Sequence, residues 1–404
     1  MDFKGTLFLL RYRNDDLGLV CLLRHLRDSI GGDKRMLQEI LTGTLSITGI
    51  AGVLSIVISV AERYLNDYGE CKIDINDGAK EMVVDGGTNL LTTLSDQKLF
   101  IPSACGGKAT CGLCKVQVFE GAGPLLPTEE PYLTQSERDG HYRLACQIKV
   151  KSDMKLGIPE ELFNIKEYMT KLEEMEDMTY DIKRLRMALP EGETISFKAG
   201  QFMQFYTKPY AKVQDVVFRA YSMSSPPQDN KHIELLIRKV PEGLCTTYVH
   251  EHLNEGDQVR LSGPYGDFYY RGNCDTMIMV AGGSGLAPMR SLIYDNLYKK
   301  IPVNMIFYFG AKSQADLYYM EEFTNLDKEN ENFKFIPILS QPDDDWTGEK
   351  GLVTEVLDRD LSAGTGAEGK EAYLCGSPGF LKAANDVLKK NGFNKDTQIF
   401  YDEF

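Results

Sequence analysis

The chain has 404 residues, of which 43% are apolar and 26% are charged, and its formal net charge at pH 7 is −14. This length predicts two to four domains, and the composition is that of folded protein, which excludes disorder over the whole chain. The acidic balance, without a basic stripe, argues against nucleic-acid binding, and nine Cys in a chain of this length do not form a small secreted disulfide scaffold.

An uncharged stretch of 22 residues runs from Ile40 to Ala61. As a helix it would be about 33 Å long, which is enough to cross the ~30 Å hydrocarbon core of a bilayer. We therefore predict a transmembrane helix at 40–61. The alternative is a buried core helix, although such helices seldom stay uncharged on every face over this length. The sequence predicts no role for residues 1–39.

The next segment, 70–157, opens with a predicted hairpin and a short helix that begins at Thr88. It then carries the densest chemical signal in the chain, a C-x5-C-x2-C loop with a fourth Cys on a later strand. These four residues are Cys105, Cys111, Cys114 and Cys146. Four thiolates suit zinc or an iron–sulfur cluster. Zinc sites prefer two C-x2–4-C pairs, and one pair is missing here, so the spacing favours a [2Fe–2S] cluster.

Glycines at positions 106, 107 and 112 interrupt this Cys-rich loop. Glycine tolerates backbone conformations that allow a tight curl, and a curled loop turns backbone N–H groups toward the cluster sulfurs. We therefore expect the loop to wrap closely around its metal centre. The pattern is near the plant-type ferredoxin spacing, with one residue added in the first gap.

Residues 158–270 predict an antiparallel β-barrel, because short alternating runs with Gly and Pro punctuation follow one another without a long helix. The predicted strands are 179–189, 194–197, 201–207, 216–223, 232–240 and 258–266.

Two pieces of this barrel carry candidate binding chemistry. In the first, strand alternation places Arg219 and Tyr221 on one face, with Ser222 at the strand end. A guanidinium can hold a pyrophosphate, a Tyr ring can lie on a planar heterocycle, and a Ser hydroxyl can bond a ring nitrogen. The second piece is a predicted helix start with a phosphate-binding turn. Its candidate residues are Gly243, Thr246 and Thr247.

Residues 271–404 alternate strand and helix, which predicts an α/β domain with a parallel sheet. The apolar run 276–281 leads into a Gly-rich turn and a helix, a setting that can cradle a dinucleotide phosphate. Its candidate residues are Gly283, Gly285 and Pro288, with Pro288 at the third position of the usual glycine fingerprint. A later strand ends at Cys375 and Gly376, and ligands of parallel sheets gather at such ends.

Taken in order, these motifs resemble the ferredoxin-NADP reductase superfamily with a fused ferredoxin domain. Within it, the sequence is most similar to the family formed by the F subunits of bacterial sodium-translocating NADH:quinone oxidoreductases. The strings FIPSACGGKATCGLCKVQV, LPTE, YRLACQ, RAYSM and GLAPMRS carry the likeness, together with an acidic-aromatic tail. It covers roughly residues 40–404. The links that precede RAYSM and the second phosphate motif are shorter here than in those proteins.

The resemblance implies three cofactors: a [2Fe–2S] cluster on the four Cys, FAD and NADH. Arg219 would hold the FAD pyrophosphate, Tyr221 would lie against the isoalloxazine, and Ser222 would bond near its N5. Residues 243–247 would complete the FAD phosphate site, and Gly283 and Gly285 would line the NADH phosphate path. Cys375 would sit near the nicotinamide, and Phe404 would cover the flavin.

From these roles we expect an NADH-dependent oxidoreductase that passes electrons from NADH through FAD and the cluster to an acceptor. Expected partners are membrane redox subunits or a protein electron acceptor. The expected location is the bacterial inner membrane, with one span and cytoplasmic catalytic domains. One alternative is a stand-alone iron–sulfur flavoprotein reductase that serves another redox protein. Another is a non-catalytic membrane subunit.

Overall fold

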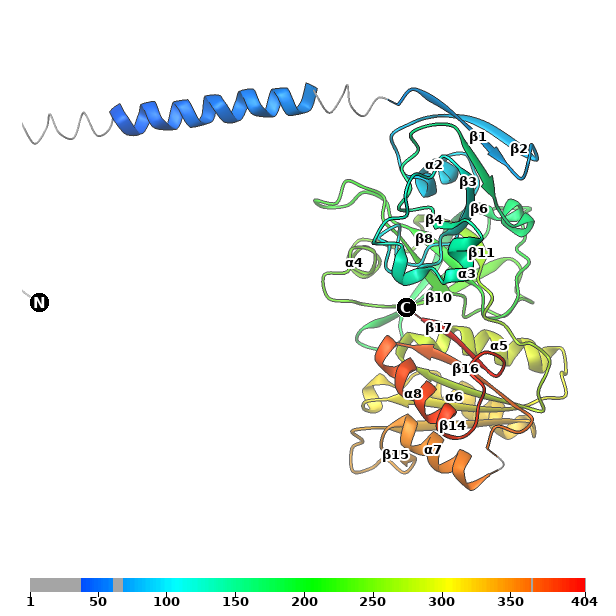
Figure 1. Cartoon of the computed structure of the whole chain (residues 1–404). Coiled ribbons are helices and arrows are strands. Elements are labelled where there is room, and N and C mark those ends of the chain that lie inside the picture. The colour runs from blue at the N-terminus through cyan, green and yellow to red at the C-terminus, as the bar shows by residue number, and fades with distance from the viewer. Residues whose placement is uncertain (1–37, 61–67, 365, 404) are drawn as a thin grey trace, which may run out of the picture. The chain divides into compact units, whose positions relative to one another are not determined.

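The computed structural model of the chain describes residues 38–60, 68–364 and 366–403, and Figure 1 shows its elements. The described residues fall into two units that divide after Tyr68. Within the first, residues Gln38–Val60 form one helix whose side chains are exposed along its whole length. Its 23 residues are long and apolar enough to cross a membrane, by length and composition alone.

The second unit begins with a five-stranded sheet in the order β2-β1-β5-β3-β4. The predicted hairpin is confirmed, because β1 and β2 pair antiparallel. The predicted helix is present as α2, but its N-cap is Asn89 rather than Thr88, since the Asn89 side chain accepts from the Thr92 N–H. The elements are β1 Glu70–Ile75, β2 Lys80–Asp85, α2 Leu90–Asp96, β3 Lys115–Glu120, α3 Gln135–Asp139, β4 Tyr142–Leu144 and β5 Met154–Gly157.

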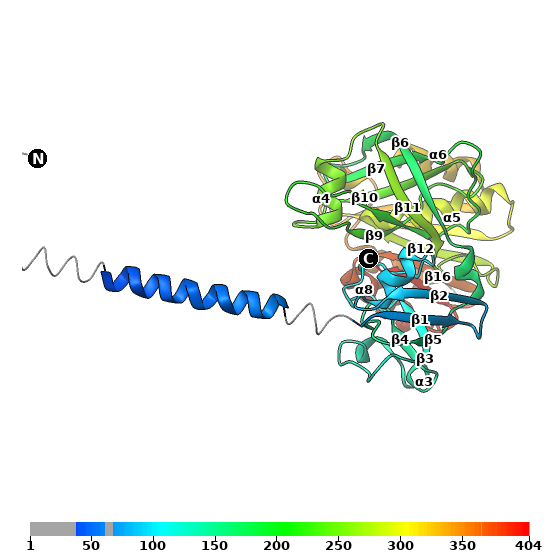
Figure 2. The same cartoon turned by 90° about the horizontal axis from the view of Figure 1, so that it is seen from above.

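The second sheet is the expected antiparallel barrel, with the order β10-β7-β6-β11-β8-β9. A bridge between Met223 and Leu235 joins the end of β9 to β10, which nearly closes the sheet. Strands β6, β7, β10 and β11 run beside one another in Figure 2. The elements are β6 Lys166–Asp177, β7 Ile182–Ala188, β8 Phe202–Tyr206, β9 Phe218–Ser222, β10 His232–Arg238, α4 Leu244–Glu251 and β11 Gln258–Tyr265.

Two barrel predictions were wrong. Residues 194–197 form no strand, although Ile195 and Phe197 still bury their side chains in the barrel core. The longest strand, β6, was missed because its seven charged residues hide the alternation of buried and exposed positions. Buried Tyr168, Thr170 and Leu172 alternate with exposed neighbours, so β6 has one face on the core and one in solvent.

The third sheet is entirely parallel, in the order β15-β14-β13-β12-β16-β17, as the alternation of strand and helix predicts. Helices α5 and α6 pack on one face and α7 and α8 on the other (Figure 1). The strands are β12 Thr276–Gly282, β13 Asn304–Ala311, β14 Phe333–Leu339, β15 Glu349–Lys350, β16 Lys370–Gly376 and β17 Ile399–Glu403. The helices are α5 Leu286–Tyr298, α6 Met320–Glu329, α7 Val353–Ala363 and α8 Pro378–Lys390.

Candidate redox site

The four candidate metal ligands come together from two places in the first sheet domain. Cys105, Cys111 and Cys114 lie on the irregular loop between α2 and β3, and Cys146 follows β4. The thiols pair two by two, Cys105 with Cys111 and Cys114 with Cys146. Within the part of the chain that the structure describes, no three His, Cys, Asp or Glu side chains converge as one metal ion would require. Four thiols from these two places are the donor set that the predicted [2Fe–2S] cluster would use.

Within each thiol pair, the pKa of one thiol is lowered and the pKa of the other is raised. The bond from Cys111 lowers the pKa of Cys105 to about 3, and the bond from Cys114 lowers the pKa of Cys146 to about 7. The same two bonds, together with burial, raise the pKa of Cys111 and Cys114. The backbone N–H of Lys108 also donates to the Cys105 sulfur at 3.2 Å. Half of the set is thus already biased toward the thiolate form that metals bind.

Strand β9 carries the three candidate flavin contacts. The Arg219 guanidinium donates to the carbonyl of Phe218 at 2.6 Å. The partly buried Tyr221 ring meets Phe205 edge-on, with 6.2 Å between the centroids. The Tyr221 hydroxyl lies near the thiol of Cys245 on α4, and burial raises the pKa of that thiol to about 11. Cys245 therefore brings the two barrel motifs together, a role that no spacing in the sequence indicated.

The predicted phosphate turn lies at the start of α4, whose N-cap is Gly243. A side chain at Gly243 would crowd the Thr246 hydroxyl oxygen at 2.5 Å. That hydroxyl accepts from the Val240 N–H at 3.2 Å and donates to the Gly243 carbonyl at 3.1 Å. Thr246 therefore shapes the turn from inside, while Thr247 is partly exposed. The N–H groups of the first helical turn remain the predicted phosphate-binding feature of this site.

The second Gly-rich turn joins β12 to α5 and lies against the end of β16. A Cβ at Gly285 would overlap with the carbonyl of Cys375, so this approach requires glycine. Gly283 has a positive φ of 56°, and its carbonyl accepts from the Tyr318 hydroxyl at 2.8 Å. Pro288 is buried in the first turn of α5. The strand ends at 282 and 376 therefore form one edge, where the topology of parallel sheets places ligands.

A third cluster of candidate residues, Ser222, Asp402 and Cys375, lies where the barrel meets the α/β domain. The Ser222 hydroxyl donates to Asp402 Oδ2 at 2.8 Å, and Asp402 on β17 is paired in register with Cys375 on β16. Burial raises the pKa of Asp402 to about 7, although the hydrogen bond from Ser222 acts in the opposite sense. Burial also raises the pKa of Cys375. Asp402 was missed in the sequence, where the acidic-aromatic tail was its only signal. Phe404 lies outside the described residues.

The Cys-rich loop packs directly on β9, the strand that carries the candidate flavin contacts. A Cβ at Gly106 would overlap with the Arg219 guanidinium and lie 2.6 Å from the Phe218 carbonyl oxygen. Nearby, the Gln204 side-chain amide donates to the Ile101 carbonyl at 3.2 Å, and Lys98 pairs with Glu167 at 3.0 Å. The loop and β9 are thus in contact, which places the four thiols on the barrel side that carries Arg219 and Tyr221.

Known proteins repeat this arrangement of domains. Residues 73–151 match the 2Fe-2S iron-sulfur cluster binding domain, 169–270 the oxidoreductase FAD-binding domain, and 279–386 the oxidoreductase NAD-binding domain. The F subunit of the Na(+)-translocating NADH-quinone reductase of Haemophilus ducreyi is 35% identical over 90% of this chain and 98% of its own length. The chain belongs to the family of these F subunits. The corresponding protein of Klebsiella pneumoniae is also 35% identical, over 91% of this chain and its whole length.

Solved structures show how far the fold of this family is shared. The Amycolatopsis cytochrome P450 reductase GcoB is 26% identical, covers 83% of this chain and 98% of its own, and superposes with a TM-score of 0.66. The ferredoxin reductase in carbazole 1,9a-dioxygenase has the same fold at 22% identity, with a TM-score of 0.63 over 83% of this chain and 98% of its own. The three-domain order therefore also occurs in reductases that are not named as part of an NADH-quinone reductase.

Proposed function

We propose that this member of the family oxidises NADH and passes the electrons through FAD and a [2Fe–2S] cluster to a membrane-bound acceptor. One observation supports it above the others: Ser222, Cys375 and Asp402 meet where the barrel joins the α/β domain, and the Cys-rich loop rests on the same strand as Ser222. When bound, the flavin takes a hydride as an electron pair and releases electrons singly, which a cluster requires.

The residues of the chain bind, orient and manage protons. The edge formed by Gly283, Gly285 and the end of β16 would hold the dinucleotide, and Tyr221 would support the isoalloxazine face. The Ser222 hydroxyl would bond near the flavin N5, and its partner Asp402 can take up or release a proton there near pH 7. Buried Cys375 helps to exclude water from the same edge.

NADH is the proposed nicotinamide substrate rather than NADPH. The strand β13 ends at Ala311, and the following turn holds the Asp316 carboxylate with the Ser313 hydroxyl at 2.7 Å and the Ser313 N–H at 2.9 Å. Hydrogen bonds and the neighbouring Arg238 lower the pKa of Asp316 against the opposing effect of burial, so it stays charged. A fixed anion near the expected ribose position disfavours the 2′-phosphate of NADPH.

Replacing one cluster ligand tests the electron path. In Cys111→Ala, we expect NADH to bleach the flavin at the wild-type rate, whereas reduction of a one-electron acceptor beyond the cluster fails. Cys71→Ala is a matched control, because Cys71 is a buried thiol on β1 outside the two thiol pairs. Anaerobic stopped-flow absorbance measures both steps. Loss of flavin bleaching in folded, FAD-loaded Cys111→Ala would contradict the proposed order.

The membrane location and partners belong to the same proposal. The helix Gln38–Val60 would anchor the chain once in the bacterial inner membrane, with its redox domains in the cytoplasm and membrane redox subunits as partners. The likeness to the P450 reductase GcoB supports a second candidate, a reductase that serves a separate redox protein. Purification from membranes separates the two, since co-purifying integral subunits support the first and a soluble redox partner supports the second.

A further inference from the structure

Helix α5 follows the Gly283–Gly285 turn directly, and its polar side chains bond to the barrel. The hydroxyl of buried Ser291 donates to the carbonyl of Ser225 at 2.8 Å. Farther along α5, the Asp295 carboxylate accepts from the Gln228 amide at 2.7 Å. Both barrel partners belong to the segment 224–228, which begins two residues after Ser222.

Arg290 is the charged member of α5 that contacts the barrel most directly through an ion pair. Its guanidinium donates to the Ser224 carbonyl at 3.1 Å and to Glu234 Oε2 at 3.1 Å, and both of these partners belong to the barrel. The opposite side of the guanidinium pairs with Glu322 of α6 at 2.7 Å, inside the α/β domain. We call this set of contacts the α5 seam. Its members are Arg290, Ser291 and Asp295 of α5 and Ser224, Ser225, Gln228 and Glu234 of the barrel.

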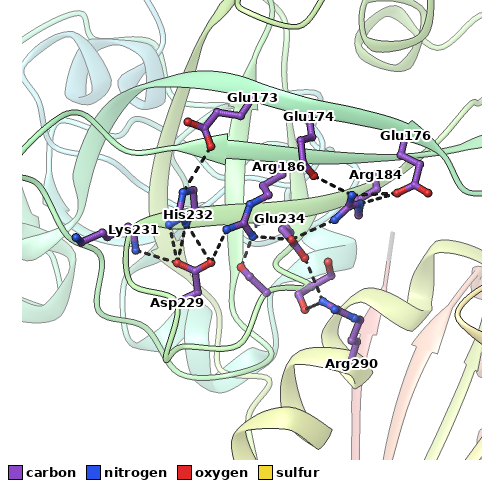
Figure 3. A network of polar contacts seen from close by, with 12 residues as sticks. Glu173, Glu174, Glu176, Arg184, Arg186, Asp229, Lys231, His232, Glu234 and Arg290 are labelled. Carbon is purple, nitrogen blue, oxygen red and sulfur yellow. Dashed lines mark hydrogen bonds and ion pairs between the residues drawn. The ribbon is translucent and has the colours of Figure 1, made fainter. Parts of the chain in front are cut away.

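Glu234 is the central charge of the seam. It is a buried carboxylate on β10, only 5% exposed, and three guanidinium groups surround it (Figure 3). Arg186 lies at 2.9 Å and Arg184 at 3.4 Å from one carboxylate oxygen, and Arg290 lies at 3.1 Å from the other. Two of these cations belong to the barrel strand β7, so the sheet fixes the orientation of the Glu234 carboxylate. Its other oxygen then faces Arg290 of α5.

The α5 seam lies close to the residues expected to hold the reacting groups. On the barrel side it begins at Ser224, close to Ser222, and on the α/β side it begins on the first turns of the helix that follows Gly285. A small rotation at the seam would therefore change the distance between Ser222 and the strand end at Cys375. Hydride transfer needs its donor and acceptor atoms about 3–3.5 Å apart, and an error of about 1 Å can cost a hundredfold in rate.

We propose that Glu234, acting through Arg290, is a positioning residue that sets the α/β domain against the barrel for hydride transfer. This inference rests on the proposed function. Glu234 holds no part of the NADH phosphate edge, which lies within the α/β domain. Loosening the seam should therefore slow the transfer itself and leave NADH binding nearly unchanged.

The test compares two carboxylates that share one guanidinium. Glu234→Gln removes the partner that crosses between domains, whereas Glu322→Gln removes the partner within the α/β domain. For Glu234→Gln, we expect the limiting rate of flavin reduction at saturating NADH to fall by about tenfold, with less than a twofold change in the half-saturating NADH concentration. For Glu322→Gln, both values should stay within about twofold of wild type. Rates are normalised to bound FAD.

A second measurement needs no NADH. Hydrogen exchange of the backbone amides in α5 and in 224–228 should become faster in Glu234→Gln and stay at the wild-type rate in 224–228 of Glu322→Gln. Should Glu234→Gln fail to fold, Ser291→Ala serves instead, since it removes one seam bond with little change in volume, and a smaller loss of limiting rate is expected.

Equal effects of the two Gln variants on the limiting rate, or no effect of either, would overturn the proposal. So would a loss that appears wholly in the half-saturating NADH concentration. If wild-type flavin is not reduced by NADH at all, the proposed function is wrong instead, and the exchange comparison alone then decides whether the seam holds the two domains together.

Discussion

The pKa of Asp402 illustrates how a single residue connects fold and chemistry. Its carboxylate sits between the barrel residue Ser222 and the strand end at Cys375, and burial raises its pKa to about 7. Because the folded pKa lies above the unfolded value, the fold favours the protonated form. The associated stability is fully present below pH ~4 and is lost as pH rises through about 7.

Asp402→Asn removes this titration and keeps a polar side chain of the same size. We expect the difference in melting temperature, wild type minus variant, to fall by about 4 °C between pH 5 and pH 8. Asp396→Asn is the control for the loss of a carboxylate, since Asp396 is exposed on the same terminal segment. A constant difference for Asp402→Asn, measured by differential scanning fluorimetry across this range, would show that the carboxyl does not titrate there.

Gly106 is the second residue at which we expect local geometry to affect electron transfer. It has a φ of +67°, and any side chain there would collide with Arg219 and the Phe218 carbonyl. In Gly106→Ala we expect the cluster to be reduced by the flavin about tenfold more slowly, while NADH reduces the flavin at the normal rate.

Gly123→Ala is the matched control for Gly106→Ala. Gly123 has nearly the same φ, +69°, but open space around its Cα, so its replacement adds backbone strain without a collision. Stopped-flow absorbance resolves flavin and cluster reduction. Equal slowing in both variants would assign the effect to strain in the domain rather than to the contact with β9.

At the scale of elements, a buried ion pair holds β4, the strand that precedes the candidate ligand Cys146. Glu129 is fully buried and binds Arg143 of β4 through two hydrogen bonds of 2.6 and 3.0 Å, and it also accepts from the Leu144 N–H. Burial alone would raise its pKa, but the bonds from Arg143 and the backbone outweigh it and hold the pKa below its usual range. Strand β4 leads directly to Cys146, so we expect this pair to hold the fourth candidate ligand in place.

Glu129→Gln should lower the stability of the domain by about 3 kcal/mol, because Arg143 would stay buried without its counter-charge. The lowered pKa means that the wild-type advantage is present above pH ~4.5 and disappears as pH falls through the folded pKa. The temperature at which the cluster absorbance bleaches measures this stability difference at pH 7 and pH 4. Glu130→Gln, at the exposed neighbouring position, should leave the bleaching temperature unchanged at both.

For the whole molecule, the candidate membrane helix and the three redox domains belong to separate units of the chain. The helix Gln38–Val60, which carries no charge from Ile40 onward, lies in the first unit, and all three sheets lie in the second, which begins at Gly69 and has its own cores. Attachment and NADH oxidation are therefore expected to be separable.

A chain that starts at Gly69 should stay soluble without detergent and reduce an artificial acceptor with NADH at the wild-type kcat. The full chain should sediment with membranes. Introducing charges at the helix centre, as in Ile50→Lys with Leu54→Lys, should release it from the membrane fraction without loss of that activity. Membrane association of the Gly69 chain would place an attachment surface in the second unit.

The sequence determined the cofactor chemistry and the order of the domains. Cysteine spacing, the RAYS strand and the Gly-rich turns are local patterns, and the [2Fe–2S], FAD and NAD domains that they predict are confirmed. Two predictions failed for local reasons. The charged face of β6 hid its alternation, so no strand was predicted there. Residues 194–197 alternate apolar and polar side chains like a strand, but they form a coil.

Contacts between distant segments were decided only in the tertiary structure. Asp402 bonds to Ser222 across 180 positions, Cys245 on α4 lies near Tyr221 on β9, and Glu234 contacts three arginines from two domains. No local pattern encodes such pairs, because a side chain acquires its partner and its pKa from whichever strands and helices the packed core brings alongside it.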